Sequence, residues 1–141
     1  MKRTFPLLVL VSLVTALLLS ACSGDLVNSA YTAAGDGTRP DELAKTTTFA
    51  SDDDLNVVVK LGTHNRELPV SAIFTAPTGE TYGTDTLEAD ETVGEVLLGL
   101  DWEAQGSVPW PVGTWTVDIF VDDTREKSLS FTVVSAGEPA G

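Results

Sequence analysis

The chain has 141 residues, with 8 basic against 21 acidic side chains, one cysteine and one histidine. This length suits a single domain, and the formal net charge of −13 argues against a nucleic-acid partner, because affinity for phosphate backbones comes mainly from Lys and Arg. A single cysteine excludes an internal disulfide, a cysteine-rich zinc site and a CxxC redox pair.

Residues 1–21 have the pattern of a signal peptide. Lys2 and Arg3 give a positively charged start, a long apolar stretch follows, and the small residues Ser20 and Ala21 come at its end. A membrane-spanning helix needs roughly 20 predominantly apolar residues, and this stretch is shorter. We therefore predict a segment that is removed from the mature protein rather than a permanent anchor.

The four residues Leu19-Ser20-Ala21-Cys22 resemble the lipobox of bacterial lipoproteins. In that family the cysteine thiol receives a diacylglycerol, and the signal peptide is cut just before the cysteine. The resemblance implies that Cys22 becomes the first residue of the mature protein and carries fatty acyl chains such as palmitate. Each buried CH₂ group contributes about 0.8 kcal/mol, so two or three chains make release from a membrane negligible. The alternatives are a buried structural cysteine or an ordinary secretory signal.

The same resemblance implies a location for the protein. It would be lipid-anchored on the cell membrane or the outer membrane, facing the periplasm or the exterior, and Ser23 rather than Asp after the cysteine points to the outer membrane if the source has two membranes. Removal of residues 1–21 would leave 6 basic and 21 acidic side chains. Anionic lipids do not attract such a body, so attachment would come from the lipid on Cys22.

Residues 22–45 are predicted to be the lipidated cysteine and a flexible acidic tether. They are rich in Gly, Ser, Ala, Thr and Asp, and their apolar residues are too scattered to form one face of a strand or helix. A flexible chain of this length has an r.m.s. span of roughly 25 to 30 Å, enough to hold a domain clear of lipid headgroups. The alternative is that Leu26, Val27 and Tyr31 dock on the domain.

From residue 46 to residue 135 the apolar residues follow a period of two, which indicates strands with one face on a core. One segment, 93–102, also has helical spacing. Gly94 and Gly99 would each cost a helix about 1 kcal/mol relative to Ala, so we interpret it as a strand. The expected strands are 47–50, 55–61, 70–75, 81–84, 93–102, 114–121 and 128–134, with a turn at 122–123.

About seven short strands with Pro and Gly between them favour two packed antiparallel sheets, an all-β sandwich over residues 46–135. Residues 136–141 are predicted to be a disordered tail. The expected core consists of bulky residues on the inward faces of these strands. They are Leu55, Val57, Val59, Phe74, Leu98, Leu100, Trp115, Val117, Ile119 and Phe131.

The stretch Trp110-Pro111-Val112-Gly113-Thr114-Trp115 resembles the end of immunoglobulin-like modules in bacterial exported proteins. Those modules commonly show Trp-Pro-x-Gly-x-Tyr, with the tyrosine at the start of the penultimate strand. Here Trp115 takes the place of the tyrosine, so the phenol's corner hydrogen bond must be absent or replaced by one from the indole N–H. The resemblance implies an immunoglobulin-like β-sandwich and specifies no ligand, because such sandwiches host many functions.

No pattern in the sequence indicates catalysis. His64 is the only imidazole, it falls in a predicted loop, and no GxSxG or HExxH motif accompanies it. We interpret it as a solvated loop residue and expect no enzymatic activity and no cofactor.

Two acidic groups are weak candidates for calcium ligands, because sandwich loops can gather Asp side chains from separate turns. They are Asp52, Asp53 and Asp54 before one strand, and Asp122 and Asp123 at a predicted hairpin. There is no D-x-D-x-D-G pattern, and adjacent carboxylates cannot all point at one ion without a special turn. We favour solvated loops for both groups.

Two candidates for a binding surface remain. Tyr82, Trp102 and Trp110 could stack on sugar rings, but Trp102 falls on the inward face of its predicted strand, and Trp110 between two prolines is as well suited to closing one end of the sandwich. Val58 and Phe120 lie on the predicted outward faces of their strands and could form a protein contact, because exposed apolar patches often mark interfaces.

The sequence thus predicts a lipid-anchored protein of the cell envelope with a non-enzymatic binding or structural sandwich. Its partner would be the membrane, through Cys22, together with an envelope protein or a polysaccharide. One alternative is an accessory subunit of an envelope assembly. Another is an inhibitor of an exported hydrolase, presented on loops such as 62–67 or 104–111.

Overall fold

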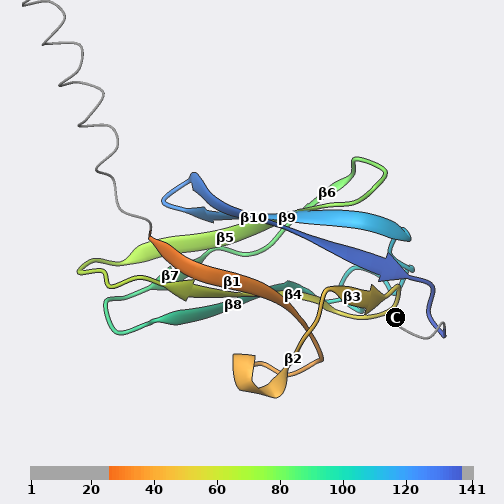
Figure 1. Ribbon diagram of the computed structural model, residues 1–141, viewed down its shortest axis with the longest axis horizontal. Helices are drawn as coiled ribbons and strands as arrows, with labels where there is room; N and C mark the ends of the chain where they lie inside the picture. The colour runs from red at the N-terminus through yellow and green to blue at the C-terminus, as the bar shows by residue number, and fades with distance from the viewer. Residues whose placement is uncertain (1–25, 138–141) are drawn as a thin grey trace, which may run out of the picture.

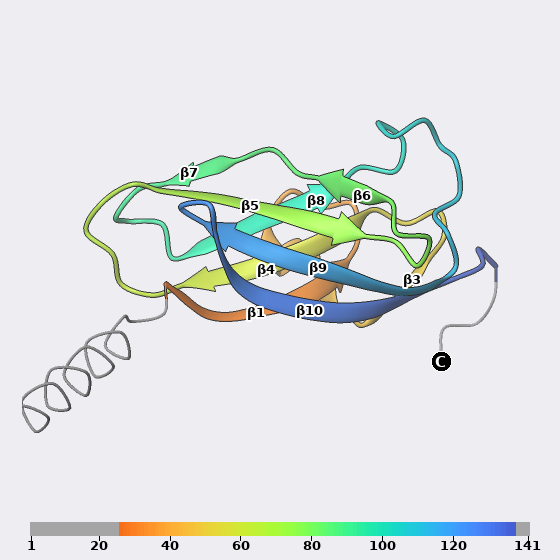
Figure 2. The same cartoon turned by 90° about the horizontal axis from the view of Figure 1, so that it is seen from above.

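The computed structural model describes residues 26–137, so the predicted signal peptide, Cys22 and residues 138–141 lie outside the described residues. The described chain forms two sheets that pack face to face (Figures 1 and 2). Its strands are β1 Val27–Ala34, β2 Ala44–Lys45, β3 Thr48–Ala50, β4 Leu55–Leu61, β5 Leu68–Thr75, β6 Thr81–Gly83, β7 Leu87–Ala89, β8 Glu95–Leu100, β9 Gly113–Val121 and β10 Thr124–Val134, with a short 3₁₀ turn, η1, at Pro40–Glu42. In this part of the chain no helix is long and apolar enough to cross a membrane.

The first sheet has the strand order β2-β1-β4-β8, and the second has the order β3-β10-β9-β5-β6, with β7 pairing to β5 as well. The long strands β1, β4 and β8 share one sheet, and β5, β9 and β10 share the other. Immunoglobulin domains divide their A, B and E strands from their C, F and G strands in the same way. The predicted all-β immunoglobulin-like sandwich is therefore confirmed.

The core lies between the two sheets and follows from the period-two pattern. In β9, Trp115, Val117, Ile119 and Val121 are all buried, and the residues between them are not. All ten residues expected in the core are buried. The hairpin turn between β9 and β10 also matches the prediction, since Asp122 and Asp123 both have positive φ, at 54° and 63°.

The segment with ambiguous periodicity is a strand, β8, as predicted. Val96, Leu98 and Leu100 face the core. Gly99 pairs with Asn56 of β4, and a side chain at Gly99 would collide with that of Asn56. Glycine is therefore required here because there is no room for a side chain.

The prediction of a flexible tether over 22–45 is wrong for the described part of that range. Residues 27–34 form β1, which pairs antiparallel with β4 and buries Val27 and Ala33. The strand lacks a clear apolar pattern because much of its attachment is the backbone ladder with β4, which is independent of side-chain type. The alternative, docking of Leu26, Val27 and Tyr31, is the better description, as Leu26 packs on the core and Tyr31 lies on the sheet.

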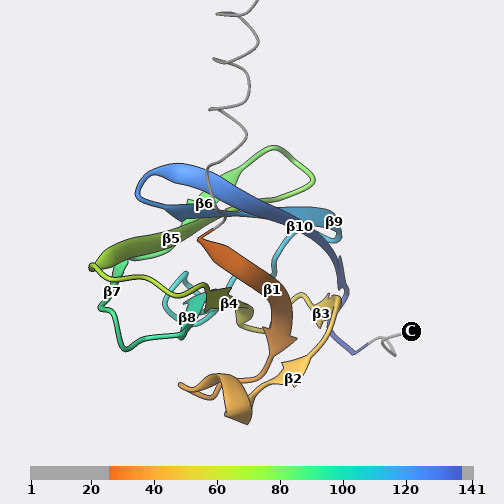
Figure 3. The same ribbon diagram turned by 60° about the vertical axis from the view of Figure 1, so that its left-hand side comes forward.

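The chain from 35 to 45, including η1, crosses the side of the first sheet that faces away from the second sheet (Figures 1 and 3). The Asn56 side chain donates a hydrogen bond to the carbonyl of Gly35 at 3.1 Å and so ties this connection to β4. The described residues contain ten strands rather than about seven, and β1, β2 and β7 are the unpredicted ones. The sandwich consequently begins about 20 residues earlier than expected, at Leu26.

Candidate functional site

Acidic loops adjoin three neighbouring strands of the first sheet at one end of the sandwich, and these loops surround one cavity. Asp36 follows β1, Asp52–Asp54 precede β4, and Asp101–Glu103 follow β8. Because β1, β4 and β8 are adjacent in the sheet, the three loops meet at the same end of the sandwich. The acidic cavity has a volume of about 550 Å³ and is lined by Gly35, Asp36, Asp52, Asp53, Asp54, Asp101, Trp102 and Glu103.

Three of the six carboxylates are held by backbone N–H groups. The Asp53 side chain accepts from Ala50 N at 2.8 Å, and the Asp101 side chain accepts from Ala104 N at 3.0 Å. The Asp54 side chain accepts from Trp102 N at 2.8 Å, which ties the loop after β8 to the loop before β4. These bonds fix the walls of the acidic cavity.

The side-chain carboxylates of the other three residues, Asp36, Asp52 and Glu103, accept no hydrogen bond from any described residue. A cleft lined by charges of one sign concentrates ions of the opposite sign. The acidic cavity is therefore suited to attract a cationic group, and Trp102 adds an aromatic side chain to the same lining.

The two groups of predicted calcium ligands do not come together. Asp52, Asp53 and Asp54 lie at the end of the sandwich described above, whereas Asp122 and Asp123 form the β9–β10 hairpin at the opposite end. Asp122 instead forms an ion pair with Arg66, whose guanidinium lowers the pKa of the Asp122 carboxyl. Among residues 26–137 no three His, Cys, Asp or Glu side chains are grouped in a way that could hold a metal ion.

The predicted sugar platform is wrong for Trp110, which lies in an aromatic cluster at the end of the core, whereas Tyr82 contacts this cluster but is partly exposed, so its role in sugar binding stays a prediction. Trp110 is buried, and its indole donates to the carbonyl of Asp53 at 2.7 Å. Tyr82 stacks on Trp115 with ring centroids 5.7 Å apart, and burial is the main cause that raises the pKa of its phenol. Trp110 closes the sandwich beside the acidic cavity, the second role considered from the sequence.

Trp115 replaces the expected tyrosine in the way the resemblance allowed. Its indole N–H donates to the carbonyl of Pro111 at 2.8 Å, so the hydrogen bond at the corner is kept with a different donor. The ring is fully buried and contacts Trp110, Tyr82 and Phe131.

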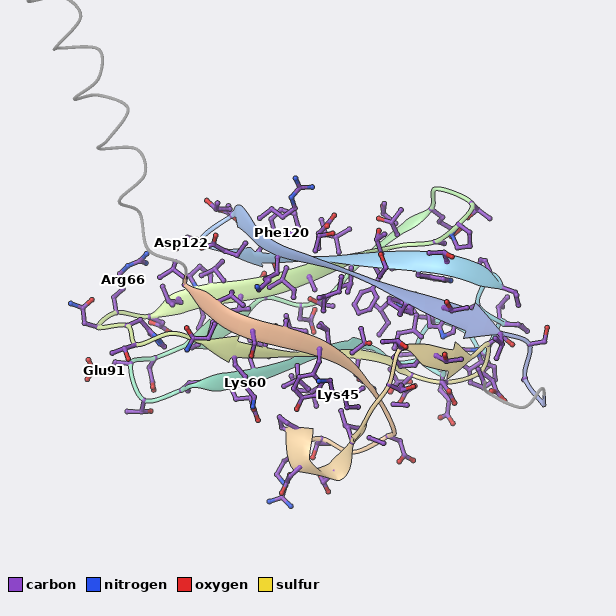
Figure 4. All side chains as sticks on the ribbon, viewed as in Figure 1. Lys45, Lys60, Arg66, Glu91, Phe120 and Asp122 are labelled. Carbon is purple, nitrogen blue, oxygen red and sulfur yellow. The ribbon has the colours of Figure 1, made fainter. Side chains whose placement is uncertain are left out.

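Val58 is not part of an exposed surface, which corrects the prediction for this residue. It faces away from the second sheet, but it is 0% exposed, between Tyr31 and Leu97 on the neighbouring strands. The chain from 35 to 45 covers this side of the sheet, and the sequence does not reveal that cover. Lys45 and Lys60 both lie near the Tyr31 ring, at 5.3 and 6.0 Å from its centroid (Figure 4).

Phe120 lies on the outer face of the second sheet, as predicted, and is partly exposed (Figure 4). It pairs with Ser71 of β5, and Ile73, two residues further along β5, is 38% exposed. The role of Phe120 in a protein contact stays a prediction.

Substitution of Val58 and of Phe120 by serine should have different effects on the free energy of unfolding. Val58→Ser should lower the free energy of unfolding by about 2 kcal/mol, because it removes a fully buried side chain. Phe120→Ser should change it by about 1 kcal/mol or less, as for most surface substitutions. Urea unfolding of both variants measures the difference, and equal losses would contradict the assignment of the two faces.

His64 is not simply a solvated loop residue. Its Nδ1 lies 2.9 Å from the carbonyl oxygen of Gly62, and its Nε2 lies 2.7 Å from that of Asp90, so the ring joins the β4–β5 loop to the β7–β8 loop. Both partners are acceptors, so both contacts are hydrogen bonds only when the ring carries two protons. The Gly62 and Asp90 carbonyls accordingly raise the pKa of His64 above 6.5.

The sign of the resulting pH dependence follows from linkage. A raised pKa in the folded state gives stability that is fully present below the unfolded pKa and is lost as pH rises through the folded pKa. We expect the free energy of unfolding to fall as pH rises from about 6.5 through the raised folded-state pKa of His64, and His64→Gln to remove that dependence. Urea unfolding at a series of pH values checks this, and an unchanged slope in the variant would refute it.

The sequence did not indicate that Asp36, Asp101, Trp102 and Glu103 share a cavity with Asp52–Asp54. They come from loops far apart in the chain, and only the order of strands in the sheet brings them together. Asp101 and Trp102 fell inside the predicted strand 93–102, and Asp36 fell inside the predicted tether, so none of them was expected in a loop beside Asp52–Asp54.

No protein-family model and no curated protein matches the chain. Among solved structures, it is similar to an immunoglobulin-like protein from Pseudomonas aeruginosa, with 15% identity and a TM-score of 0.49, over 81% of this chain and 99% of that one.

A second solved structure, an alkylpurine DNA glycosylase from Pseudomonas fluorescens bound to DNA, shows 12% identity and a TM-score of 0.41 over 62% of this chain and 27% of that one. Neither similarity identifies a function, because a shared fold does not imply a shared site. The strand order shows that the chain folds as an immunoglobulin-like β-sandwich.

Proposed function

We propose that this protein is a lipid-anchored lipoprotein of the bacterial cell envelope, whose sandwich acts by binding and not by catalysis. The observation that carries the anchor is the lipobox-like sequence Leu19-Ser20-Ala21-Cys22, placed behind a basic start and an apolar stretch. In this proposal the thiol of Cys22 loses its proton and displaces the phosphate headgroup from the glyceryl carbon of a membrane phospholipid, which forms a diacylglyceryl thioether, and residues 1–21 are removed by hydrolysis of the Ala21–Cys22 peptide bond. The acyl chains then hold an acidic domain at a membrane that its charge would not attract.

The absence of enzymatic activity is part of the same proposal. His64, the only imidazole in the sequence, directs both ring nitrogens at backbone carbonyl oxygens, so neither is placed to accept a proton from a substrate. The core between the sheets is closed by buried aromatic residues at the end beside the acidic cavity. Binding at a surface is the function that this arrangement supports best.

We place the binding surface at the acidic cavity and propose a cationic partner, such as a basic patch on an envelope protein. Six carboxylates line this cavity, and three of them are held in place by backbone N–H groups. Long-range attraction of a basic partner by such a site is strongest at low salt. A polysaccharide ligand and the inhibitor role remain outcomes that the binding experiment distinguishes.

The anchor is tested by metabolic labelling with radioactive palmitate in a bacterial host, followed by fractionation of the parent and Cys22→Ser. The parent should be labelled and should sediment with membranes. The Cys22→Ser variant should carry no label and should leave the membrane fraction. Membrane association of Cys22→Ser equal to that of the parent, or an unlabelled parent, would overturn the lipoprotein assignment.

The binding surface is tested by capture from envelope extract with lipid-free residues 23–141. One variant neutralises the acidic cavity with Asp36→Asn, Asp52→Asn and Glu103→Gln, and a matched control makes the same charge change at the opposite end with Glu67→Gln, Glu91→Gln and Asp123→Asn. A basic protein should be retained at low salt by the parent and the control and lost by the cavity variant. Equal retention by all three would contradict the assignment of the cavity, and retention of polysaccharide would replace the cationic partner.

A further inference from the structure

We infer that the anchored sandwich stands on the lipid surface with one defined end, the end at which β1 begins, and presents the acidic cavity away from the membrane. The inference rests on the lipid anchor of the proposed function. It goes beyond that function, because an anchor alone does not orient a domain. The number of residues between Cys22 and Leu26, the first residue that the structure describes, limits how far the domain can stand from the lipid.

That length is short. Only four peptide units join Cys22 to Leu26, and at roughly 3.5 Å per residue they span at most about 14 Å. Leu26 is already fixed to the body, since its carbonyl accepts a hydrogen bond from Gly62 N at 2.8 Å, and Val27 is 3% exposed. The tether of roughly 25 to 30 Å expected from the sequence would have let the domain turn freely, but residues 27–34 are used in β1.

The end at which β1 begins is built from three loops that are joined to one another. Val27 pairs with Leu61, which places the start of β1 beside the β4–β5 loop. His64 in that loop contacts the Asp90 carbonyl in the β7–β8 loop. Arg66 forms an ion pair with Asp122 of the β9–β10 hairpin. Arg66, Glu91 and Asp122 lie together at this end in Figure 4, so we call it the anchor end.

The chemistry of the anchor end suits contact with a headgroup layer rather than insertion into hydrocarbon. Its loops expose polar and charged side chains, including Arg66, Glu91 and Asp123. The large apolar side chains that are exposed in residues 26–137 lie outside these loops, at Ile73, Leu87, Val108 and Val112. The short connection to the lipid therefore brings the anchor end against the headgroup layer, while the acyl chains lie in the hydrocarbon beneath it.

The acidic cavity lies at the other end of the strands. β4 begins beside the cavity and ends at the anchor end, while β8 runs the opposite way and ends at Leu100 beside the cavity. The nine residues of β9 alone span roughly 30 Å. A partner bound at the cavity would then approach from the aqueous compartment, at a distance from the membrane set by the length of the sandwich.

Fluorescence quenching of the lipidated full-length protein on phosphatidylcholine vesicles tests the orientation. Glu91→Cys at the anchor end and Glu103→Cys at the acidic cavity are each labelled with the same thiol-reactive dye, since acylation blocks the Cys22 thiol. Some vesicles carry a nitroxide quencher on the lipid headgroup. We expect strong quenching of the dye at position 91 and none at position 103. As a control, a flexible insertion of 20 residues after Ser23 should reduce quenching at position 91 to the level seen at 103.

The outcomes separate this inference from the proposed function. Protein that floats with the vesicles but shows equal quenching at both positions, or stronger quenching at 103, lies flat or inverted and overturns the orientation alone. Quenching at position 91 that is unchanged by the insertion also overturns it, because the short connection would not be the cause. Protein that fails to float overturns the anchor and the orientation together.

Discussion

A chain that starts at residue 46 is expected not to fold, whereas a chain that starts at residue 26 is expected to unfold in one cooperative transition. The shorter chain lacks β1, so β4 loses its ladder on one side, and Val27 and Ala33 are removed from buried positions. Val58 loses its cross-strand neighbour Tyr31. We expect the combined loss to exceed about 5 kcal/mol, the lower limit of typical domain stability.

Far-ultraviolet circular dichroism and urea unfolding of the two chains measure this effect. If residues 26–45 were a tether, the two chains would have the same unfolding midpoint, since removal of a solvated segment leaves the core intact. Cooperative unfolding of the shorter chain at the midpoint of the longer one would therefore contradict the place of β1 in the sheet. Separate removal of residues 1–21 should leave the transition unchanged.

Trp115→Ala should lower the free energy of unfolding by about 3 to 5 kcal/mol, which is the cost of removing a large aromatic side chain from a packed core. Trp115 is 0% exposed, and its ring contacts Tyr82, Trp110 and Phe131. Trp115→Phe should lower the free energy of unfolding by less, because it keeps an aromatic ring in the core. It still removes the indole donor to the carbonyl of Pro111, a hydrogen bond that typically contributes about 1 kcal/mol.

Trp102→Ala is the matched control for this prediction. Trp102 is only partly buried, although its indole donates to the carbonyl of Val108 at 3.0 Å. We expect a loss of about 1 kcal/mol for this variant in the same urea titration. A loss at Trp115 no greater than that at Trp102 would mean that the aromatic cluster does not stabilise the sandwich.

The sheets were predictable where one face of a strand meets the core. In β5 and β9 the buried residues alternate along the strand, so the pattern identified both the strands and the inward residues. The β9–β10 turn was also predictable, since Asp tolerates the positive φ that Asp122 and Asp123 adopt.

The pattern fails where burial comes from a second layer of chain or from backbone pairing. β1 is held to β4 by a ladder that small and polar residues such as Ser29 and Ala30 satisfy as well as apolar ones. Val58 is buried on the side of the sheet that period-two reasoning assigns to solvent, and the chain from 35 to 45 crosses that side of the sheet (Figure 3).

The acidic cavity could be predicted only in part. The Asp52–Asp54 run was visible as a candidate, but its grouping with Asp122 and Asp123 was wrong because the two loops lie at opposite ends of the strands. Its true neighbours, Asp36 and Asp101, depend on which strands are adjacent in the sheet, and this is a property of the topology and not of local sequence.

The central claim is that a lipid on one cysteine holds this sandwich at a membrane, and mass spectrometry of the N-terminal peptide from membrane-extracted protein tests it most directly. The account predicts that the mature chain begins at Cys22 and that this residue carries the mass of a diacylglycerol thioether. A chain that begins upstream of Cys22, or a Cys22 with an unmodified thiol, would contradict it.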